Sequence, residues 1–440
     1  MADSVTLKLP AWLRGVLGGA AALAAIGCVF LEVREQQKEM EAFSRLGGRV
    51  STEQPSSHPL VVLLVRNEGE SRSLADHFVV EGSGRWAFVV SPGTYSLGAF
   101  EDANENLAYD PGERALRPLA GPRFVLASGQ SEDGVELVIP DEGADVEGPI
   151  DIGALQARTT HDQLRLSLGQ LSVEGEVVSL DDPRFDAENG KLGLWRPLDF
   201  VLDVGPGIYF VEEYAAGKLP VLFVHGIDGT PRQFEPLVEH LDRDRFQPWL
   251  YYYPSGGRLD RVSDHLRELV VELAVRYRVD QLCVVAHSMG GLVARSFILK
   301  HAASDVRPSV ILFASISTPW EGDAAAQKGV EHAPAVVYSW RDVAPGSEFL
   351  DALFFEDPGV RSARRRLPES IPYHLLFSYR RNGSWPGPSG DGVVTEASQL
   401  RAEAQEEAVG LRGFDEDHTS ILRSDRVSGY LSEALARALR

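Results

Sequence analysis

The sequence has very little cysteine and no excess of positive charge. Only two cysteines, Cys28 and Cys283, occur in 440 residues. This excludes a disulfide framework and leaves the redox compartment open. The formal net charge is −21, whereas proteins that bind nucleic acid need a basic surface to contact the phosphates. We therefore expect no nucleic-acid partner.

The chain also has few long runs without charge, and the clearest one lies near the N-terminus. Residues 15–31 (GVLGGAAALAAIGCVFL) carry no charge, and Lys8 and Arg14 precede them. This length is at the lower limit for a membrane-spanning helix and also fits a signal-peptide core. We expect an uncleaved signal anchor, with the bulk of the chain on the exported side, periplasmic or extracellular. A lipoprotein linked through Cys28, a cleaved signal and a soluble helix are the alternatives.

A charged, helix-forming segment follows the apolar run. Residues 32–46 (EVREQQKEMEAFSRL) are expected to form a solvated extension of the anchor, and Gly47-Gly48 is expected to end this helix. The first region of the chain is therefore residues 1–47, a signal anchor with its charged helical extension.

Residues 48–140 contain short apolar runs such as LVVLLV and WAFVV, separated by turn clusters such as EGSG and SPG. This spacing predicts a small antiparallel β-sandwich domain. Within it, residues 88–113 (FVVSPGTYSLGAFEDANENLAYDPGE) resemble the carboxypeptidase-regulatory-like and transthyretin-like β-sandwich modules of exported proteins. The sequence indicates no particular protein partner for this domain.

The same stretch contains a loop with the spacing of calcium ligands. Its oxygen-bearing residues fall at positions 1, 3, 5, 9 and 12, as in a calcium loop. Leu107 occupies the place where such loops need glycine, and a strand precedes the loop, so it is not an EF-hand. A structural calcium site is one interpretation and an acidic surface loop is the other. The residues concerned are Asp102, Asn104, Asn106, Asp110 and Glu113.

Residues 141–215 form a linker with lead-in strands, and the pattern changes in residues 216–440. Apolar strands such as LPVLFV, QLCVVA and SVILFASI alternate with helical segments such as RVSDHLRELVVELAVRY. Continuous apolar strands separated by helices predict a mostly parallel sheet covered by helices on both faces, which is the α/β fold class.

Ser288 lies at a strand-to-helix corner, in the sequence V-V-A-H-S-M-G-G. A nucleophile elbow needs this context, because the strained turn exposes the serine Oγ above the sheet. The residues two positions away must be small, and they are Ala286 and Gly290. A helix that starts after the serine also directs N–H groups toward developing negative charge. The alternative is a serine at an ordinary tight turn.

Upstream, V-L-F-V-H-G-I-D-G ends an apolar strand with His-Gly. This H-G-x-x-G loop and the A-x-S-x-G elbow resemble the bacterial lipase/esterase-like branch of the α/β-hydrolase superfamily, over roughly residues 215–440. The resemblance implies an α/β-hydrolase fold and an oxyanion hole made by the backbone N–H groups of Ile227 and Met289. In this motif His225 is structural. The glycines that allow close approach to the substrate are Gly226 and Gly229.

The resemblance also implies an acid and a histidine after the serine, in that order. Asp391 in G-D-G-V-V resembles the family's triad acid, and His418 in H-T-S-I resembles its histidine. Asp415 and Asp417 are alternative partners for the histidine. Otherwise Asp391 belongs to a Gly-Asp-Gly turn and His418 is a surface residue at a helix start. His287 is set aside, because neighbouring side chains at an elbow are expected to diverge.

Two further segments, STPWEGDAAA and PGSEFL, resemble the region of the lipase-like branch between the elbow and the triad acid. We expect this region to form a cap over the site. Four of its large apolar side chains are candidates for an acyl pocket, and core packing is the alternative for each. They are Trp320, Trp340, Phe349 and Leu350.

Together these patterns predict a membrane-anchored serine hydrolase that cleaves carboxylic esters, with lipid or acyl esters as the expected substrates, through an acyl-enzyme on Ser288. No cofactor is expected for catalysis. One alternative is a non-catalytic binding protein of the cell envelope with a hydrolase fold. Another is the same triad acting on amides or thioesters, which the fold does not distinguish.

Overall fold

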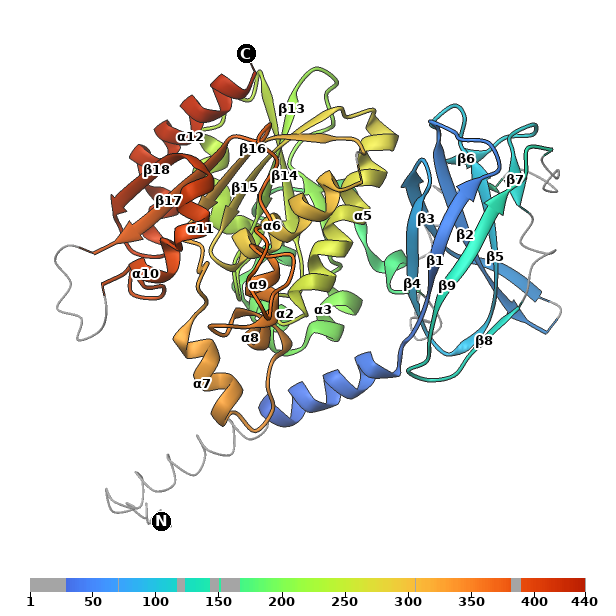
Figure 1. The fold of residues 1–440 in the computed structure, drawn as a ribbon, viewed down its shortest axis with the longest axis horizontal. Helices are drawn as coiled ribbons and strands as arrows, with labels where there is room; N and C mark the ends of the chain where they lie inside the picture. The colour runs from blue at the N-terminus through green and yellow to red at the C-terminus, as the bar shows by residue number, and fades with distance from the viewer. Residues whose placement is uncertain are drawn as a thin grey trace, which may run out of the picture.

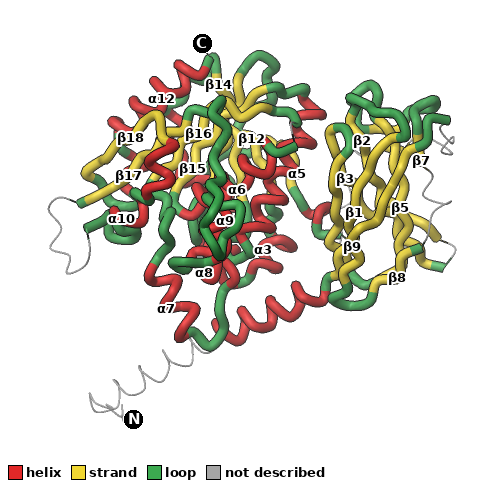
Figure 2. The backbone as a smooth tube through the Cα atoms, viewed as in Figure 1, coloured by secondary structure: helices red, strands yellow, loops and turns green. Residues whose placement is uncertain are grey.

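The computed structural model describes residues 29–69, 71–116, 123–142, 150–151, 167–304, 306–380 and 389–439. Two bodies lie side by side in Figure 1: an all-β body and a larger α/β body. A helix of residues 29–42 runs along the α/β body and leads into the first strand of the all-β body. Strands dominate the smaller body, whereas helices surround the sheet of the larger one (Figure 2).

The all-β body is a sandwich of two sheets, so the expected β-rich region is present, but it is not wholly antiparallel, because one pair of strands runs in parallel. One sheet has the order β4-β1-β9 and the other the order β3-β2-β5-β7, with β8 also paired to β5. Side chains such as Val62, Trp86 and Leu97 form a buried core cluster in this body. The strands are β1 (Ser44–Thr52), β2 (Pro59–Glu68), β3 (Ser71–Glu81), β4 (Gly84–Val90), β5 (Gly93–Glu101), β6 (Ala108–Tyr109), β7 (Ala115–Leu116), β8 (Phe124–Leu126), β9 (Ser131–Ile139) and β10 (Ile150–Asp151).

Gly47 and Gly48 lie inside β1, so the prediction that they end the N-terminal helix is wrong. The helix already ends at residue 42, and β1 pairs with β4 on one side and in parallel with β9 on the other. A Cβ on Gly48 would lie 1.8 Å from the carbonyl oxygen of Val135 in β9. Because glycine has no side chain, the two strands can approach closely here. From sequence alone, a glycine in this role looks the same as a glycine that ends a helix.

The helix of residues 29–42 is docked on one face and is not fully solvated, which corrects the second expectation for this segment. Val33 is 3% exposed and packs with Leu194 and Val337 of the α/β body. Because this contact is so small, the charged sequence shows almost no periodic repeat of apolar residues. The sequence pattern therefore suggested a solvated helix. Among the described residues no helix is long and apolar enough to cross a membrane, and most of the expected anchor, residues 15–28, lies outside them.

The α/β body is built on an eight-stranded sheet of order β11-β12-β14-β13-β15-β16-β17-β18. Every neighbouring pair is parallel except β12 and β14. The central strands are buried along nearly their whole length, as helices on both faces require, so the predicted α/β class is confirmed. The strands are β11 (Val173–Val177), β12 (Gly207–Phe210), β13 (Leu219–Val224), β14 (Phe246–Tyr252), β15 (Gln281–His287), β16 (Ser309–Ile316), β17 (Tyr373–Tyr379) and β18 (Ala408–Asp415).

Helices cover the sheet from both sides (Figure 1). Residues of α5 and α6 share one core cluster with the segment between β16 and β17, and residues of α4 and α12 belong to the second cluster. The helices are α2 (Ala187–Trp195), α3 (Pro197–Asp203), α4 (Glu235–Glu239), α5 (Leu259–Tyr277), α6 (Met289–Ala302), α7 (Ala324–His332), α8 (Tyr338–Val343), α9 (Glu348–Ala352), α10 (Glu396–Gln399), α11 (Ala402–Glu407) and α12 (Asp425–Ala438), with 3-10 turns η2 (Gly169–Leu171), η3 (Pro183–Phe185), η4 (Pro231–Phe234) and η5 (Ser420–Arg423).

Candidate active site

Ser288 stands between the end of β15 and the start of α6, with φ 55° and ψ −133°. A residue other than glycine rarely takes this backbone conformation, because it costs roughly 1–3 kcal/mol and persists only where the surrounding structure imposes it. The surroundings here are tightly packed. A Cβ on Gly290 would lie 2.3 Å from the carbonyl oxygens of both Val224 and His225. The small residue after the serine is therefore a geometric requirement of this corner.

The structure brings Ser288, His418 and Asp391 together in one hydrogen-bonded chain. His418 Nε2 lies 2.9 Å from Ser288 Oγ, and His418 Nδ1 lies 2.7 Å from Asp391 Oδ2. The three side chains come from the elbow, from the loop after β18 and from the loop after β17. Since the carboxylate can only accept, Nδ1 donates to it and Nε2 is left to accept the Ser288 hydroxyl proton. The arrangement can deprotonate a nucleophilic serine.

Asp391 is held by groups that the sequence reading missed. Its Oδ2 accepts hydrogen bonds from Ser378 Oγ at 2.7 Å and from Gln399 Nε2 at 3.2 Å. Its Oδ1 accepts from the backbone N–H groups of Val393 and Val394. Burial raises the pKa of Asp391, but the hydrogen bonds from His418, Ser378 and the backbone outweigh it, so the pKa lies below the ordinary value. The carboxylate therefore stays charged.

The alternative carboxylate, Asp417, has another role. It caps the turn η5 by accepting hydrogen bonds from the N–H groups of Thr419 and Ser420, and it pairs with Arg380 at 2.9 Å. The backbone donors of Ser420 and Thr419 and the Arg380 contact lower its pKa, against the opposing effect of burial. Asp391 is therefore the carboxylate that contacts His418 in this structure.

His287 lies against His418, contrary to the expectation that its side chain diverges from the site. The two rings lie 4.8 Å apart between centroids, and His287 Nε2 donates to the carbonyl oxygen of His418 at 2.8 Å. Burial lowers the pKa of His287 to about 3, so the ring is neutral. The expectation considered only the neighbouring side chains of His287 and Ser288. It could not include the loop of His418, which lies 131 residues later in the chain.

The expected oxyanion donors flank the nucleophile. Met289 is the first residue of α6, and no hydrogen bond of its N–H group or of the Ile227 N–H group is recorded among the described residues. A Cβ on Gly226 would lie 2.7 Å from the Cβ of Ser288, so the His-Gly loop touches the elbow. The buried ring of His225 stacks on Tyr253 and accepts from its N–H group at 3.3 Å, which agrees with a structural role.

Comparison with known proteins agrees with this geometry. Residues 221–428 match the model of the alpha/beta hydrolase family. This region has the α/β-hydrolase fold, and we call it the hydrolase domain. Among solved structures it is similar to the mature lipase BlEst2 of Bacillus licheniformis, at 17% identity and TM-score 0.39, over 51% of this chain and 94% of that one.

Two other solved structures are similar over about half of this chain. One is a lipase-esterase related protein of Clostridium acetobutylicum, at 14% identity and TM-score 0.34, covering 53% of this chain and 98% of that one. The other is lipase B of Aspergillus fumigatus, at 17% identity and TM-score 0.38, covering 52% of this chain and 56% of that one. No curated protein matches the chain.

The four candidate pocket residues of the hydrolase domain pack mainly in its core. Trp320 and Leu350 are 0% and 1% exposed and belong to the core cluster under the cap, while Trp340 and Phe349 pack against that cluster. Trp340 also meets Trp195 edge to face at 5.6 Å. Core packing accounts for all four side chains, so an acyl pocket lined by them stays a prediction.

The expected calcium loop folds around its own backbone. The Asp102 carboxylate accepts from the N–H groups of Asn106 and Leu107, and the Glu113 carboxylate accepts from Ala103 and Asp110. Leu107 has φ 56°, the left-handed conformation for which such loops use glycine. These bonds fit an acidic surface loop without a metal, and calcium binding stays a prediction. The amides of two further residues donate to Asp110 at 2.7 and 2.9 Å, namely Asn104 and Asn106.

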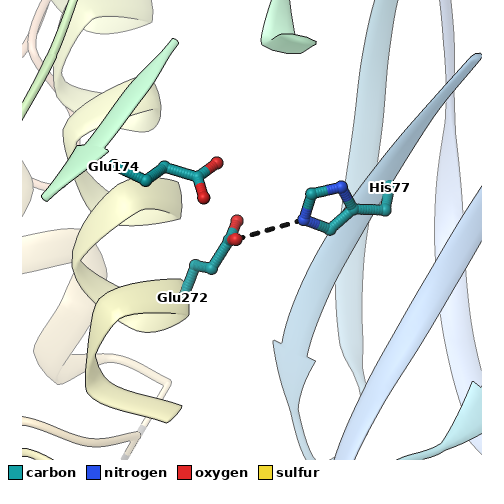
Figure 3. A group of neighbouring side chains, drawn as sticks. All are labelled: His77, Glu174 and Glu272. Atoms are coloured by element: carbon teal, nitrogen blue, oxygen red, sulfur yellow. Dashed lines mark hydrogen bonds and ion pairs between the residues drawn. The ribbon is translucent and has the colours of Figure 1, made fainter. Parts of the chain in front are cut away.

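One group of three metal-ligating side chains occurs among the described residues, between the two bodies. His77 comes from β3 of the sandwich, and Glu174 and Glu272 come from β11 and α5 of the hydrolase domain (Figure 3). Arg276 already bridges the two carboxylates, at 2.6 Å from Glu174 and 2.7 Å from Glu272. Burial and the charge of Glu272 raise the pKa of Glu174 well above its ordinary value, while the charge of His77 outweighs burial and lowers the pKa of Glu272. The group serves as an ion-pair network across the interface.

Proposed function

We propose that the chain is a membrane-anchored serine hydrolase that cleaves carboxylic esters, with lipid or acyl esters as the substrate class. The proposal rests above all on the 2.9 Å hydrogen bond between Ser288 Oγ and His418 Nε2, within a chain that ends at the buried carboxylate of Asp391. A hydroxyl is a weak nucleophile unless an adjacent base takes its proton. In these hydrogen bonds His418 is the base, and Asp391 is the group that orients it.

The proposed reaction has two halves. His418 Nε2 takes the Ser288 proton as Oγ attacks the ester carbonyl, and Asp391 stabilises the imidazolium that forms. The N–H groups of Ile227 and Met289 hold the oxyanion. His418 then gives the proton to the departing alkoxide, which leaves as the alcohol. Water, deprotonated by His418, releases the acid from the acyl-enzyme and restores the Ser288 hydroxyl.

A fluorophosphonate probe tests the nucleophile. We expect labelling of the wild-type chain and of Ser304→Ala, which alters an exposed serine, and no labelling of Ser288→Ala. An unlabelled wild type would favour the alternative of a non-catalytic binding protein. A panel of p-nitrophenyl esters of increasing chain length, compared with peptide and thioester substrates, then tests the ester preference. Faster turnover of a thioester or an amide would show that esters are not the preferred substrates.

Membrane attachment is the second part of the proposal and is supported by the uncharged run of residues 15–31. We expect the full chain to sediment with membranes, with the hydrolase domain accessible to protease from the exported side. A chain that begins at residue 29 should remain in the supernatant. If Cys28→Ala alone released the chain, lipid attachment at that cysteine would replace the anchor helix.

A further inference from the structure

A cavity of about 510 Å³ lies between the β-sandwich and the hydrolase domain. Its apolar wall combines Phe78 and Phe88 of the sandwich with Val262 and Leu269 of α5. None of the triad residues lines it. Small-molecule sites occur preferentially at domain interfaces, in cavities of roughly 300–1,000 Å³ with apolar walls and a few polar groups. This cavity has the size and place of such a site.

The cationic side chains that line the cavity already have partners. His77 Nε2 lies 3.1 Å from Glu272, as the dashed line in Figure 3 marks. The three lining arginines are also engaged: Arg45 pairs with Asp133, Arg261 with Asp264 at 3.8 Å, and Arg258 stacks over the ring of Tyr338 at 5.4 Å. The positive charges of the lining are thus committed to the protein itself.

Three carboxyl groups of the lining form no ion pair among the described residues: Asp76, Glu268 and the exposed Glu41, which accepts from the Tyr338 hydroxyl at 2.9 Å. Among the described residues no ion pair involves Asp76 or Glu268. Asp76 is 3% exposed; its Oδ1 accepts from the N–H group of His77 at 2.8 Å, and the charge of His77 and a hydrogen bond from Ser167 also act on the carboxyl group. Burial raises the pKa of Asp76 to about 6 and that of Glu268 to about 8. Neither group forms an ion-pair contact, although the charge of His77 lowers the pKa of Asp76 and the charges of Arg267 and Arg45 lower that of the half-buried Glu268.

Tyr251 and His265 also line the cavity, and their polar atoms are bonded within the protein. Tyr251 donates its hydroxyl proton to the carbonyl of Val262 at 2.9 Å, so it accepts from His265 Nδ1 at 3.0 Å. His265 Nε2 then accepts from Ser172 Oγ at 2.8 Å. Burial lowers the pKa of His265 to about 4, so the ring is neutral. Neither Tyr251 nor His265 therefore brings a positive charge to Asp76 or Glu268.

We propose that this interdomain cavity binds an amphiphilic amine, with its apolar body against Phe78, Phe88 and Leu269 and its ammonium group on the carboxylates of Asp76 and Glu268. An ammonium offers three donors and a positive charge in direct contact with both groups. A carboxylate or phosphate head would meet the like charge of Asp76, and an alcohol would bring no positive charge to either group. Binding at neutral pH transfers the proton of Glu268 to the solvent. The site is separate from the proposed esterase site.

Calorimetry of the full-length chain with three ligands that share one apolar body tests the site. The ligands are 4-phenylbutylamine, 4-phenylbutanol and 4-phenylbutyrate. We expect saturable one-to-one binding of the amine, at least tenfold weaker binding of the alcohol and no binding of the acid. At pH 7 the heat of amine binding should vary with the ionisation enthalpy of the buffer, because a proton is released. No saturable amine binding, or equal affinity for the acid, would overturn the proposal.

Variants assign the site to its residues. Glu268→Gln and Asp76→Asn should each weaken amine binding at least tenfold, whereas Glu239→Gln, on the exposed end of α4, should leave it unchanged. Hydrolysis of p-nitrophenyl esters should stay at the wild-type rate in all three variants, which separates this site from the proposed esterase. Unchanged amine affinity in the double variant of Asp76 and Glu268 would place the ligand elsewhere and refute the assignment.

Discussion

His418 Nδ1 lies 2.7 Å from Asp391 Oδ2, although 27 residues and the whole of β18 separate the two side chains in the chain. Asp417 is the immediate sequence neighbour of His418, yet it faces the N–H groups of Thr419 and Ser420. Asp391→Asn should therefore lower kcat by about 10⁴-fold with little change in KM, because the amide favours the wrong tautomer of the imidazole.

The matched control for that variant is Asp417→Asn, which keeps the capping oxygen of the turn η5. We expect its kcat to stay within about twofold of the wild type, measured by steady-state hydrolysis of a p-nitrophenyl ester. Equal losses in the two variants would mean that Asp391 has no special part in orienting His418.

His287→Phe should lower kcat by about tenfold and leave KM nearly unchanged, because it removes one hydrogen bond that positions the loop of His418. The donor is His287 Nε2 and the acceptor is the carbonyl of His418, 2.8 Å away. His301→Phe removes the same kind of bond, from a ring N–H group to the carbonyl of Pro308, also 2.8 Å long. That control should lower Tm without lowering kcat. A kcat loss in His301→Phe alone would contradict the positioning role.

Two glycine-to-alanine changes should have opposite effects on stability. Gly290→Ala should cost about 2 kcal/mol of unfolding free energy, because overpacking strains a well-packed site. The new Cβ would lie 2.3 Å from two backbone carbonyl oxygens. Gly429→Ala, in α12, meets no atom within 4 Å and should stabilise by about 0.5–1 kcal/mol. Urea unfolding measures both, and a Gly290→Ala protein as stable as the wild type would contradict the packing argument.

Gln36→Ala should detach part of the docked helix of residues 29–42. Gln36 Oε1 accepts from the N–H groups of Leu198 at 2.9 Å and Asp199 at 3.1 Å, so it caps the first turn of α3 from a distant part of the chain. Loss of a cap costs about 1–2 kcal/mol. Thermal unfolding should show this loss in Gln36→Ala and none in Glu39→Ala, an exposed change on the same helix. Similar Tm values for both would indicate a loosely bound helix.

Glu268→Gln should change how stability depends on pH. Burial raises the pKa of Glu268 from 4.5 to about 8, so the folded protein holds this proton more tightly than the unfolded chain. The stabilisation by this group is complete below pH 4.5 and is lost as the pH rises through about 8. We expect the variant to match the wild type at pH 5 and to exceed it by about 2 kcal/mol at pH 9, allowing for partial solvation. Glu239→Gln should show no such divergence in urea unfolding.

Local patterns were enough to predict the elbow, the His-Gly loop and the α/β sheet, because each depends on residues close together in sequence. The expected candidates Ser288, Asp391 and His418 also fall together in space. What the sequence did not reveal are contacts made across the fold. Ser378 and Gln399 look like ordinary polar residues until β17 and α10 place them on Asp391.

The N-terminal errors have the same physical origin. A helix that buries only Val33 and Gln36 carries no hydrophobic period long enough to predict docking. Gly48 obeys a strand-packing requirement set by Val135, which lies in a strand much later in the chain. Sequence patterns report the local structural preference of a segment. In these segments, contacts with distant parts of the chain determine the structure instead.

The docked helix of residues 29–42 has a mechanical consequence. At about 1.5 Å per residue it is a rod roughly 20 Å long, held against α3 through Gln36 and against the segment between α7 and α8, where Gln37 donates to the carbonyl of Val336 at 2.7 Å. It reaches β1 after a single intervening residue. A flexible linker lets the chain enter a domain from any direction, whereas this rod fixes the direction from which the chain arrives.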